Sequence, residues 1–167
     1  MGGSGRSGAR FNLLSDDDRE VFGQLSVFSG GFTLEEAEAV CEAFDVFESV
    51  MELRKQSLFR LDPMNQRFIM LDSIREYAME KLDQSPDQGA AVKNRHAQAF
   101  LRFARERVAK VRTPGEALAL RELQEREGNL NIALEWSITS QQSALAAELS
   151  LMAGILLQRH GFSKIHV

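Results

Sequence analysis

Few residues of this 167-residue chain combine types and spacing that could do chemistry. The single cysteine, Cys41, excludes an internal disulfide and any site built from several thiolates. The three histidines are His96, His160 and His166, and none has another histidine or cysteine at metal-ligand spacing. No Gly-x-x-x-x-Gly-Lys-Ser/Thr loop and no strand ending in paired acids is present to hold a nucleotide or Mg²⁺. The sequence therefore predicts no catalytic residue, no metal site and no cofactor in this chain.

The same residues have simpler structural interpretations. Cys41 falls on the apolar side of a helical pattern, which favours a small core residue over a reactive thiol. His96 lies among alanines and phenylalanines and is expected to be packed. Three consecutive aspartates at 16–18 suit the positive end of a helix dipole, and we favour that interpretation over a cation site. The lack of a nucleophile–base pair also disfavours a hydrolase.

Charge is distributed unevenly along the chain, although the net charge is only −4. Residues 1–10 carry +2, residues 11–85 carry −9 and residues 86–167 carry +3. The polar segment 84–89 contains a proline and a glycine, so we expect a linker there and a domain boundary near residue 86. Residues 1–10 are interpreted as a disordered tag or linker. No stretch approaches 18 uninterrupted apolar residues, which predicts no membrane span, and the single cysteine fits the cytoplasm.

The periodicity of residues 11–85 predicts three helices, a β-hairpin and a further helix. The hairpin strands are expected at 57–61 and 67–71, joined by a turn at 62–66. This is the element order of a winged helix. Each predicted helix start has side chains suited to cap it, namely Ser15, Thr33 with Glu36, Asp45, and Asp72 with Ser73. The phenylalanines expected in the core are Phe22, Phe28, Phe32, Phe47, Phe59 and Phe68.

Residues 86–167 predict a mainly helical second domain. Helices are expected at about 90–111, 114–139 and 143–160, with Gly128 weakening the second without breaking it. Small residues between the helices favour antiparallel pairs of the tetratricopeptide type. The third helix is apolar on nearly all sides, so we expect truncated repeats and either a dimer across this helix or an exposed patch.

Four segments carry a resemblance to a known family. They are FNLLS (11–15) with LSVFSGGFTLEEAEAVC (25–41), RFIMLDSIREYA (67–78), RHA (95–97) and NLNIALEWS (129–137). Together they resemble the region that follows the ATPase core in bacterial STAND signalling NTPases, among them LuxR- and SARP-type regulators. The resemblance covers nearly all of residues 11–160 and implies a winged helix followed by tetratricopeptide-like repeats.

The resemblance implies a regulatory, non-enzymatic role for this chain. In that family the winged helix packs on an upstream ATPase core that holds ADP or ATP with Mg²⁺, and the repeats receive a protein or small-molecule inducer. Related proteins carry a Met-His-Asp motif whose histidine reaches the nucleotide. The matching positions are Met70, Leu71 and Asp72, where Leu71 replaces the histidine and puts direct nucleotide contact in doubt.

A winged helix that binds DNA is the alternative function. The helix that would enter the major groove displays more acidic than basic residues, and the hairpin offers only Arg60 and Arg67 to phosphates. A net charge of −9 over residues 11–85 repels the phosphate backbone, which disfavours DNA binding.

A basic run follows in the second part. It comprises Arg102, Arg105, Arg107, Lys110 and Arg112. These residues form either a solvated helix face or, as a second interpretation, a surface that docks against acidic protein such as the first domain.

Overall fold

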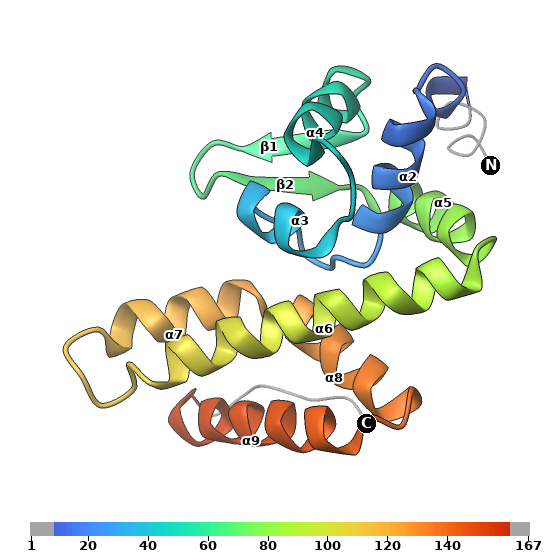
Figure 1. The fold of residues 1–167 in the computed structure, drawn as a ribbon. Coiled ribbons are helices and arrows are strands. Elements are labelled where there is room, and N and C mark those ends of the chain that lie inside the picture. Colours follow the sequence, from blue (N-terminus) through green and yellow to red (C-terminus); the bar gives the residue numbers. More distant parts are fainter. Residues whose placement is uncertain (1–8, 161–167) are drawn as a thin grey trace. The chain divides into compact units, whose positions relative to one another are not determined.

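The computed structural model describes residues 9–160, and the side chains of residues 9–155. The predicted tag or linker at residues 1–10 therefore falls almost entirely outside the described residues. These described residues are mainly helical with one two-stranded antiparallel sheet, as the sequence predicted (Figure 1). The chain divides into two compact units, the first extending to His96 and the second beginning at Ala97. No helix in the described part is long and apolar enough to cross a membrane.

The first unit has the winged-helix order of elements. Its elements are α2 (Asp16–Leu25), α3 (Leu34–Val40), α4 (Val46–Lys55), β1 (Phe59–Asp62), β2 (Arg67–Met70), α5 (Asp72–Asp83) and the first turns of α6 (Pro86–Val108). Helix α2 packs against both α4 and α5, and α4 also contacts α3 and β1. Three helices and a hairpin thus enclose one core, with α5 closing it (Figure 1).

An isolated β-bridge, which the periodicity did not predict, joins a further segment of the chain to the hairpin. In the hairpin register, Leu61 pairs with Phe68 and Arg60 with Ile69. On the other side of β2, Phe32 forms a bridge with Phe68 through hydrogen bonds of 3.0 and 2.7 Å between their backbone groups. The segment between α2 and α3 is therefore attached to the sheet.

Three of the four predicted helix caps are confirmed. Their side chains accept hydrogen bonds from backbone amides in the first turn: Ser15 from Asp18 (3.1 Å), Thr33 from Glu36 (3.2 Å) and Asp45 from Glu48 (2.8 Å). The fourth prediction is wrong, because Leu71 occupies the cap position of α5 without a side-chain cap. Asp72 is instead the first helical residue, where its charge still favours the helix dipole.

The aromatic core of the first unit is as predicted except at one position. Phe22, Phe28, Phe32, Phe59 and Phe68 are buried, and the Phe32 ring contacts the rings of Phe28, Phe59 and Phe68. Phe47 was expected in this core and is instead 51% exposed. The buried stripe of α4 is Val46, Ser49, Val50 and Leu53, spaced three and four residues apart, so Phe47 falls on an adjacent face of the helix.

The polar segment at 84–89 is a tight turn, contrary to the expected linker. Gln84 and Ser85 alone separate α5 from α6, and the Gly89 amide donates to the Ser85 carbonyl at 2.9 Å. Pro86 occupies the first position of α6, where its missing amide hydrogen costs nothing. The packing boundary between the two units falls later, inside α6.

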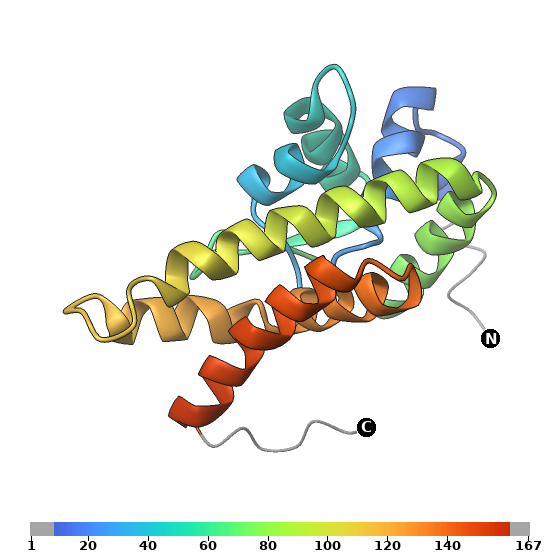
Figure 2. The same ribbon diagram turned by 60° about the horizontal axis from the view of Figure 1, so that its bottom comes forward.

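Up to residue 160, where the described part of the chain ends, the regular elements of the second unit are all helices. It contains the C-terminal half of α6, α7 (Glu116–Glu125), α8 (Glu127–Thr139) and α9 (Ser143–His160), and α9 turns back along α8 (Figure 2). The predicted single helix at 114–139 is two helices, because the backbone at Arg126 (φ −109°, ψ 11°) leaves the helical region. A small core of Ala104, Leu120 and Leu123 joins α6 to α7, with Leu130 of α8 and Met152 of α9 packed against it.

Candidate functional site

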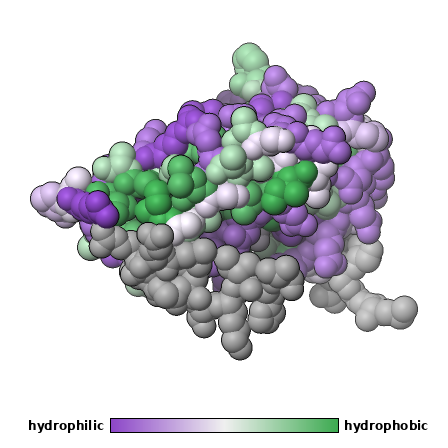
Figure 3. Space-filling view, turned by 90° about the horizontal axis from the view of Figure 1, so that it is seen from below, coloured by the Kyte–Doolittle hydropathy of each residue, from purple (hydrophilic) through white to green (hydrophobic). Residues whose placement is uncertain are grey.

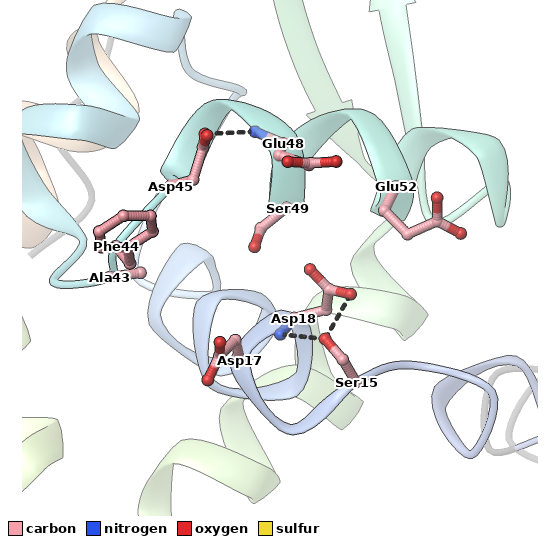
Figure 4. Close-up of a pocket in the computed structure, with 9 residues that line it drawn as sticks. All are labelled: Ser15, Asp17, Asp18, Ala43, Phe44, Asp45, Glu48, Ser49 and Glu52. Atoms are coloured by element: carbon pink, nitrogen blue, oxygen red, sulfur yellow. Dashed lines mark hydrogen bonds between the residues drawn. The ribbon is translucent and has the colours of Figure 1, made fainter.

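A pocket in the first unit lies between the start of α2 and helix α4. Its volume is about 400 Å³, and we call it the α2–α4 pocket (Figure 4). The lining residues are Ser15, Asp17, Asp18, Ala43, Phe44, Asp45, Glu48, Ser49 and Glu52. Five of these carry carboxylates and none is basic, so the pocket is strongly acidic.

Two helix N-termini explain why so many acids converge here. The 15–18 segment starts α2 and the 45–48 segment starts α4, and acidic side chains stabilise both starts. Asp45 caps α4, and one carboxylate oxygen of Asp18 accepts a hydrogen bond of 2.6 Å from the Ser15 hydroxyl. Part of the acidic character therefore has a local structural cause.

The three remaining acids of the pocket differ in their partners. Glu52 pairs with Lys55 (3.1 Å), and hydrogen bonds from Gln56 and Lys55 hold the pKa of its carboxyl below the ordinary value. Glu52 is therefore ionised at neutral pH. Among the described residues, the side chains of Asp17 and Glu48 have no hydrogen-bond or ion-pair partner. Within that same part of the chain, no group of three potential ligands is arranged to hold a metal ion.

The residues predicted to contact a nucleotide switch lie at the turn from β2 into α5. Met70 ends β2 and is half-buried, whereas Asp72 begins α5 and is exposed. The side chain of Leu71 is 64% exposed. The Leu71 carbonyl accepts from the amides of Ile74 and Arg75, both at 2.9 Å, so its backbone starts α5 while its side chain is available to a partner.

The predicted docking surface is partly used inside the second unit. Arg105 donates through Nε to Glu148 of α9 at 2.9 Å, and Arg107 donates through Nε to Glu122 of α7 at 3.0 Å. Arg102, Lys110 and Arg112 are exposed. Two of the five cations thus stabilise contacts between helices, which leaves a weaker basic surface than the sequence suggested.

The hairpin arginines differ sharply in their surroundings. Arg60 is exposed, but Arg67 is only 3% exposed. The Arg67 guanidinium donates to the Gly31 carbonyl at 2.6 Å and lies 3.8 Å from the Glu36 carboxylate. Arg67 therefore cannot reach DNA phosphates, and the expectation that it could is wrong.

Two further arginines, Arg75 and Arg95, have structural roles that no sequence pattern predicted. Arg75 donates through Nε to the carbonyls of Ser26 (2.9 Å) and Phe28 (2.7 Å), which ties α5 to the end of α2. Arg95 donates through Nε to the Val40 carbonyl at 2.7 Å, at the end of α3. Both arginines belong to the segments that carry the family resemblance, so at these two positions the resemblance has a structural cause within the first unit.

His96 and Cys41 occupy the structural positions expected of them. His96 is 1% exposed, and its ring packs edge-on against Phe28 at 5.2 Å between centroids. Cys41 is buried where α3 ends. Burial raises the pKa of the Cys41 thiol from 9.0 to about 12, although the nearby positive charge of Arg95 acts in the opposite direction.

We expect folded Cys41 to resist thiol reagents. Near pH 8 the raised pKa lowers its thiolate fraction about a thousandfold relative to a thiol of pKa 9.0. The pKa of this thiol is higher in the folded chain than in the unfolded chain. The contribution of the protonated Cys41 thiol to the stability of the fold is therefore complete below about pH 9 and is lost as the pH rises towards 12. Reaction with Ellman's reagent should be slow in buffer and fast in guanidinium chloride.

The dependence of stability on pH can be tested with Cys41→Ala as the control variant. Urea unfolding near pH 7 and pH 10 should show a loss of stability that Cys41→Ala reduces, because alanine has no proton to lose. Equal thiol reaction rates for the folded and unfolded chain would contradict the burial of this thiol.

Comparison with known proteins places this chain beside bacterial regulators. "Putative HTH-type transcriptional regulator Rv0890c" of Mycobacterium tuberculosis (strain H37Rv) and "Putative HTH-type transcriptional regulator Mb0914c" of Mycobacterium bovis are each 30% identical to it over 135 residues. The matched region covers 75% of this chain, and the chain spans about 15% of the length of these relatives. No family model matches the sequence, and no solved structure matches it. The chain is thus similar to one portion of larger regulatory proteins.

Proposed function

We propose that this chain is a non-catalytic regulatory portion of a larger cytoplasmic STAND-type ATPase and transcription regulator. In this proposal the winged helix packs on the nucleotide-binding core of the same polypeptide, which holds ATP or ADP with Mg²⁺. The helices of the second unit begin a scaffold for a protein or small-molecule inducer. The order of winged helix and helical unit supports the proposal, as does similarity to regulators that this chain spans only in part.

The exposed residues of α4 are the observation that supports contact with protein instead of DNA. In a DNA-binding winged helix, the third helix enters the major groove. Here that helix exposes Glu48 and begins at the exposed cap Asp45, and its Phe47 ring is 51% exposed. Carboxylates repel phosphates, whereas exposed aromatic rings are enriched at the centres of protein interfaces.

The turn from β2 to α5 supplies the second contact in this proposal. Leu71 presents an apolar side chain at the position of the family's nucleotide-sensing histidine. A leucine cannot donate a hydrogen bond to a phosphate, so it would pack against the core instead of reading the nucleotide.

The second unit offers apolar surface to an inducer. Hydrophobic residues form a green band on the face shown in Figure 3. Leu151 of α9 is 61% exposed and Ile138 of α8 is 59% exposed. Exposed apolar patches commonly mark interaction sites. Dimerisation through α9 is the competing use of this surface, and the side chains of residues 156–160 lie outside the described residues.

Replacing Leu71 with aspartate tests the proposed docking. We expect this charge at an apolar contact to weaken binding to the ADP-loaded ATPase domain of the natural protein at least tenfold, without lowering the melting temperature. Leu118→Asp in the second unit, where the leucine is 52% exposed, is the matched control and should bind normally. Isothermal titration calorimetry provides the affinities. Equal binding by wild type and Leu71→Asp would contradict this contact.

A mobility-shift assay on this chain tests the alternative function, DNA binding, which the HTH-type description of the relatives favours. We expect no mobility shift with duplex DNA even at low salt, because the surface of α4 is acidic and Arg67 is buried. A tight, sequence-selective shift would replace the proposed function with the alternative.

A further inference from the structure

Strand β1 forms the outer edge of the hairpin. The sheet has the order β1–β2 (Figure 1), and Phe32 bridges to β2 from the side opposite β1. Within the described part of the chain, no strand lies on the other side of β1. An edge of this kind is available to a further strand, because its outward amides and carbonyls have no partner in the sheet.

The register shows which backbone groups face this edge. Successive residues of an antiparallel strand direct their amide and carbonyl groups alternately to its two sides. Phe68 uses its amide and carbonyl for the bridge to Phe32, so these groups point away from β1. Its cross-strand neighbour Leu61 therefore forms a pair without hydrogen bonds and directs its own amide and carbonyl outward. Neither group of Leu61 has a hydrogen-bond partner among the described residues.

The side chains on either side of Leu61 carry opposite charges. Arg60 is exposed, and in the part of the chain that the structure describes it has no ion-pair partner. Asp62 is partly exposed, and its Oδ1 accepts from the Met64 amide at 3.0 Å, which holds the carboxylate at the end of β1. Side chains two residues apart on a strand lie on the same face. Arg60 and Asp62 therefore share one face of β1, beside the outward backbone groups of Leu61.

We propose that β1 pairs with β1 of a second copy of this chain, antiparallel and centred on Leu61. In this arrangement the two leucines lie opposite each other and exchange both of their outward backbone hydrogen bonds. Each Arg60 then lies opposite Asp62 of the second copy, so two identical ion pairs form across the strands. The contact uses the same surface on both copies, as two-fold dimers do. The two hairpins become one continuous sheet.

The charges favour a second copy over other occupants of this edge. Edge strands are often protected by charged side chains, since pairing then brings like charges together. Parallel pairing of two β1 strands in register does so, because each Arg60 lies beside Arg60 of the second copy. Antiparallel pairing about Leu61 instead places every arginine opposite an aspartate. A strand of unrelated sequence has no such match built in.

The contact is small, so we expect weak association. One short strand from each copy is far below the roughly 20–30 residues a side of a standard interface. Pro63 has no amide hydrogen and ends the pairing after Asp62. We therefore expect a dissociation constant of about 0.1 to 1 mM for the chain by itself. This inference does not depend on the proposed function, because docking to an ATPase core is measured with that core and with Leu71→Asp.

The first experiment dilutes the ¹⁵N-labelled full chain and follows amide chemical shifts together with the sedimentation coefficient. We expect a monomer–dimer equilibrium and concentration-dependent shifts at residues 59–63. Shifts confined to residues 138–155 would place the contact on the apolar surface of the second unit and contradict the proposal. A chain that stays monomeric at concentrations up to about 1 mM would also contradict it.

Charge substitutions test the register. Arg60→Asp and Asp62→Arg should each weaken self-association at least fivefold, because like charges then face each other across the strands. A one-to-one mixture of the two variants should recover association, since one chain carries acids at both positions and the other carries arginines at both. Melting temperatures check that each variant folds. A mixture that associates no better than either variant alone would rule out this pairing.

Leu61→Pro tests the backbone contact. Proline is tolerated in an edge strand where the missing amide hydrogen faces solvent. The variant should keep the hairpin, because the Leu61 amide does not bond to β2, and it should lose self-association. Leu61→Val retains the amide and is the matched control, expected to associate like the wild type. If Leu61→Pro associates as strongly as Leu61→Val, the edge of β1 is not the interface.

Discussion

Alanine in place of Gly31 is expected to lower the free energy of unfolding of the first unit by about 3 kcal/mol. Gly31 has φ +92°, a conformation that other L-residues rarely adopt. A Cβ at this position would lie 2.7 Å from the carbonyl oxygen of Phe68. That oxygen accepts the hydrogen bond that joins the Phe32 segment to β2, so it cannot retreat without loosening the bridge.

Gly30 provides a matched control for this prediction. Its φ of +76° is also positive, but a Cβ there would meet nothing within 4 Å. Gly30→Ala should therefore cost about 1 kcal/mol, from backbone strain alone. Urea unfolding followed by circular dichroism measures both variants. Equal losses for the two alanines would show that the contact with Phe68 does not matter.

Loss of the Arg67 guanidinium has the second large expected effect. Arg67→Met should lower the free energy of unfolding by about 3 kcal/mol, because removing one member of a buried pair leaves the other without compensation. The affected groups are the Gly31 carbonyl, 2.6 Å from Arg67, and the Glu36 carboxylate, whose side chain is 14% exposed. Glu36 also closes the capping box of α3 by accepting from the Thr33 amide at 2.9 Å. The first turn of α3 should therefore loosen.

Arg60→Met is the control on the same hairpin. Arg60 is exposed, so its replacement should change stability by less than about 0.5 kcal/mol. Chemical denaturation again provides the comparison, and amide hydrogen exchange in α3 reports the local loosening expected of Arg67→Met only. Because Gly31 and Arg67 touch, their substitutions should combine non-additively. A loss as small for Arg67→Met as for Arg60→Met would contradict the structural role of Arg67.

Much of the local structure could be predicted because it depends on near neighbours in the chain. Ser15, Thr33 and Asp45 cap helices through amides three residues away. The break at Arg126 was not predictable in the same way. The sequence drew attention to Gly128, yet the chain leaves the helix two residues earlier. There the Arg126 guanidinium lies 5.0 Å from the centre of the Phe103 ring, a contact between residues far apart in the chain.

The candidate pocket shows the same limit. Four of its five acids, all except Glu52, stand at helix starts, and the triplet at 16–18 was interpreted in that way. The position of Asp17 and Asp18 opposite Glu48 and Ser49 depends on α2 packing against α4. Nothing in the local pattern indicated that Ser49 would be buried or that Phe47 would be exposed, because five apolar residues of α4 competed for one inward stripe.

The sequence by itself determined the order of elements, the acidic charge of the first unit and most of the helix starts. The tertiary structure decided what those charges do. Arg60 and Arg67 looked equivalent as hairpin cations, but the bridge between Phe32 and Phe68 brings the Gly31 loop beside β2 and buries Arg67. Periodicity specifies which residues share a face, whereas contact with a distant segment determines which face is covered.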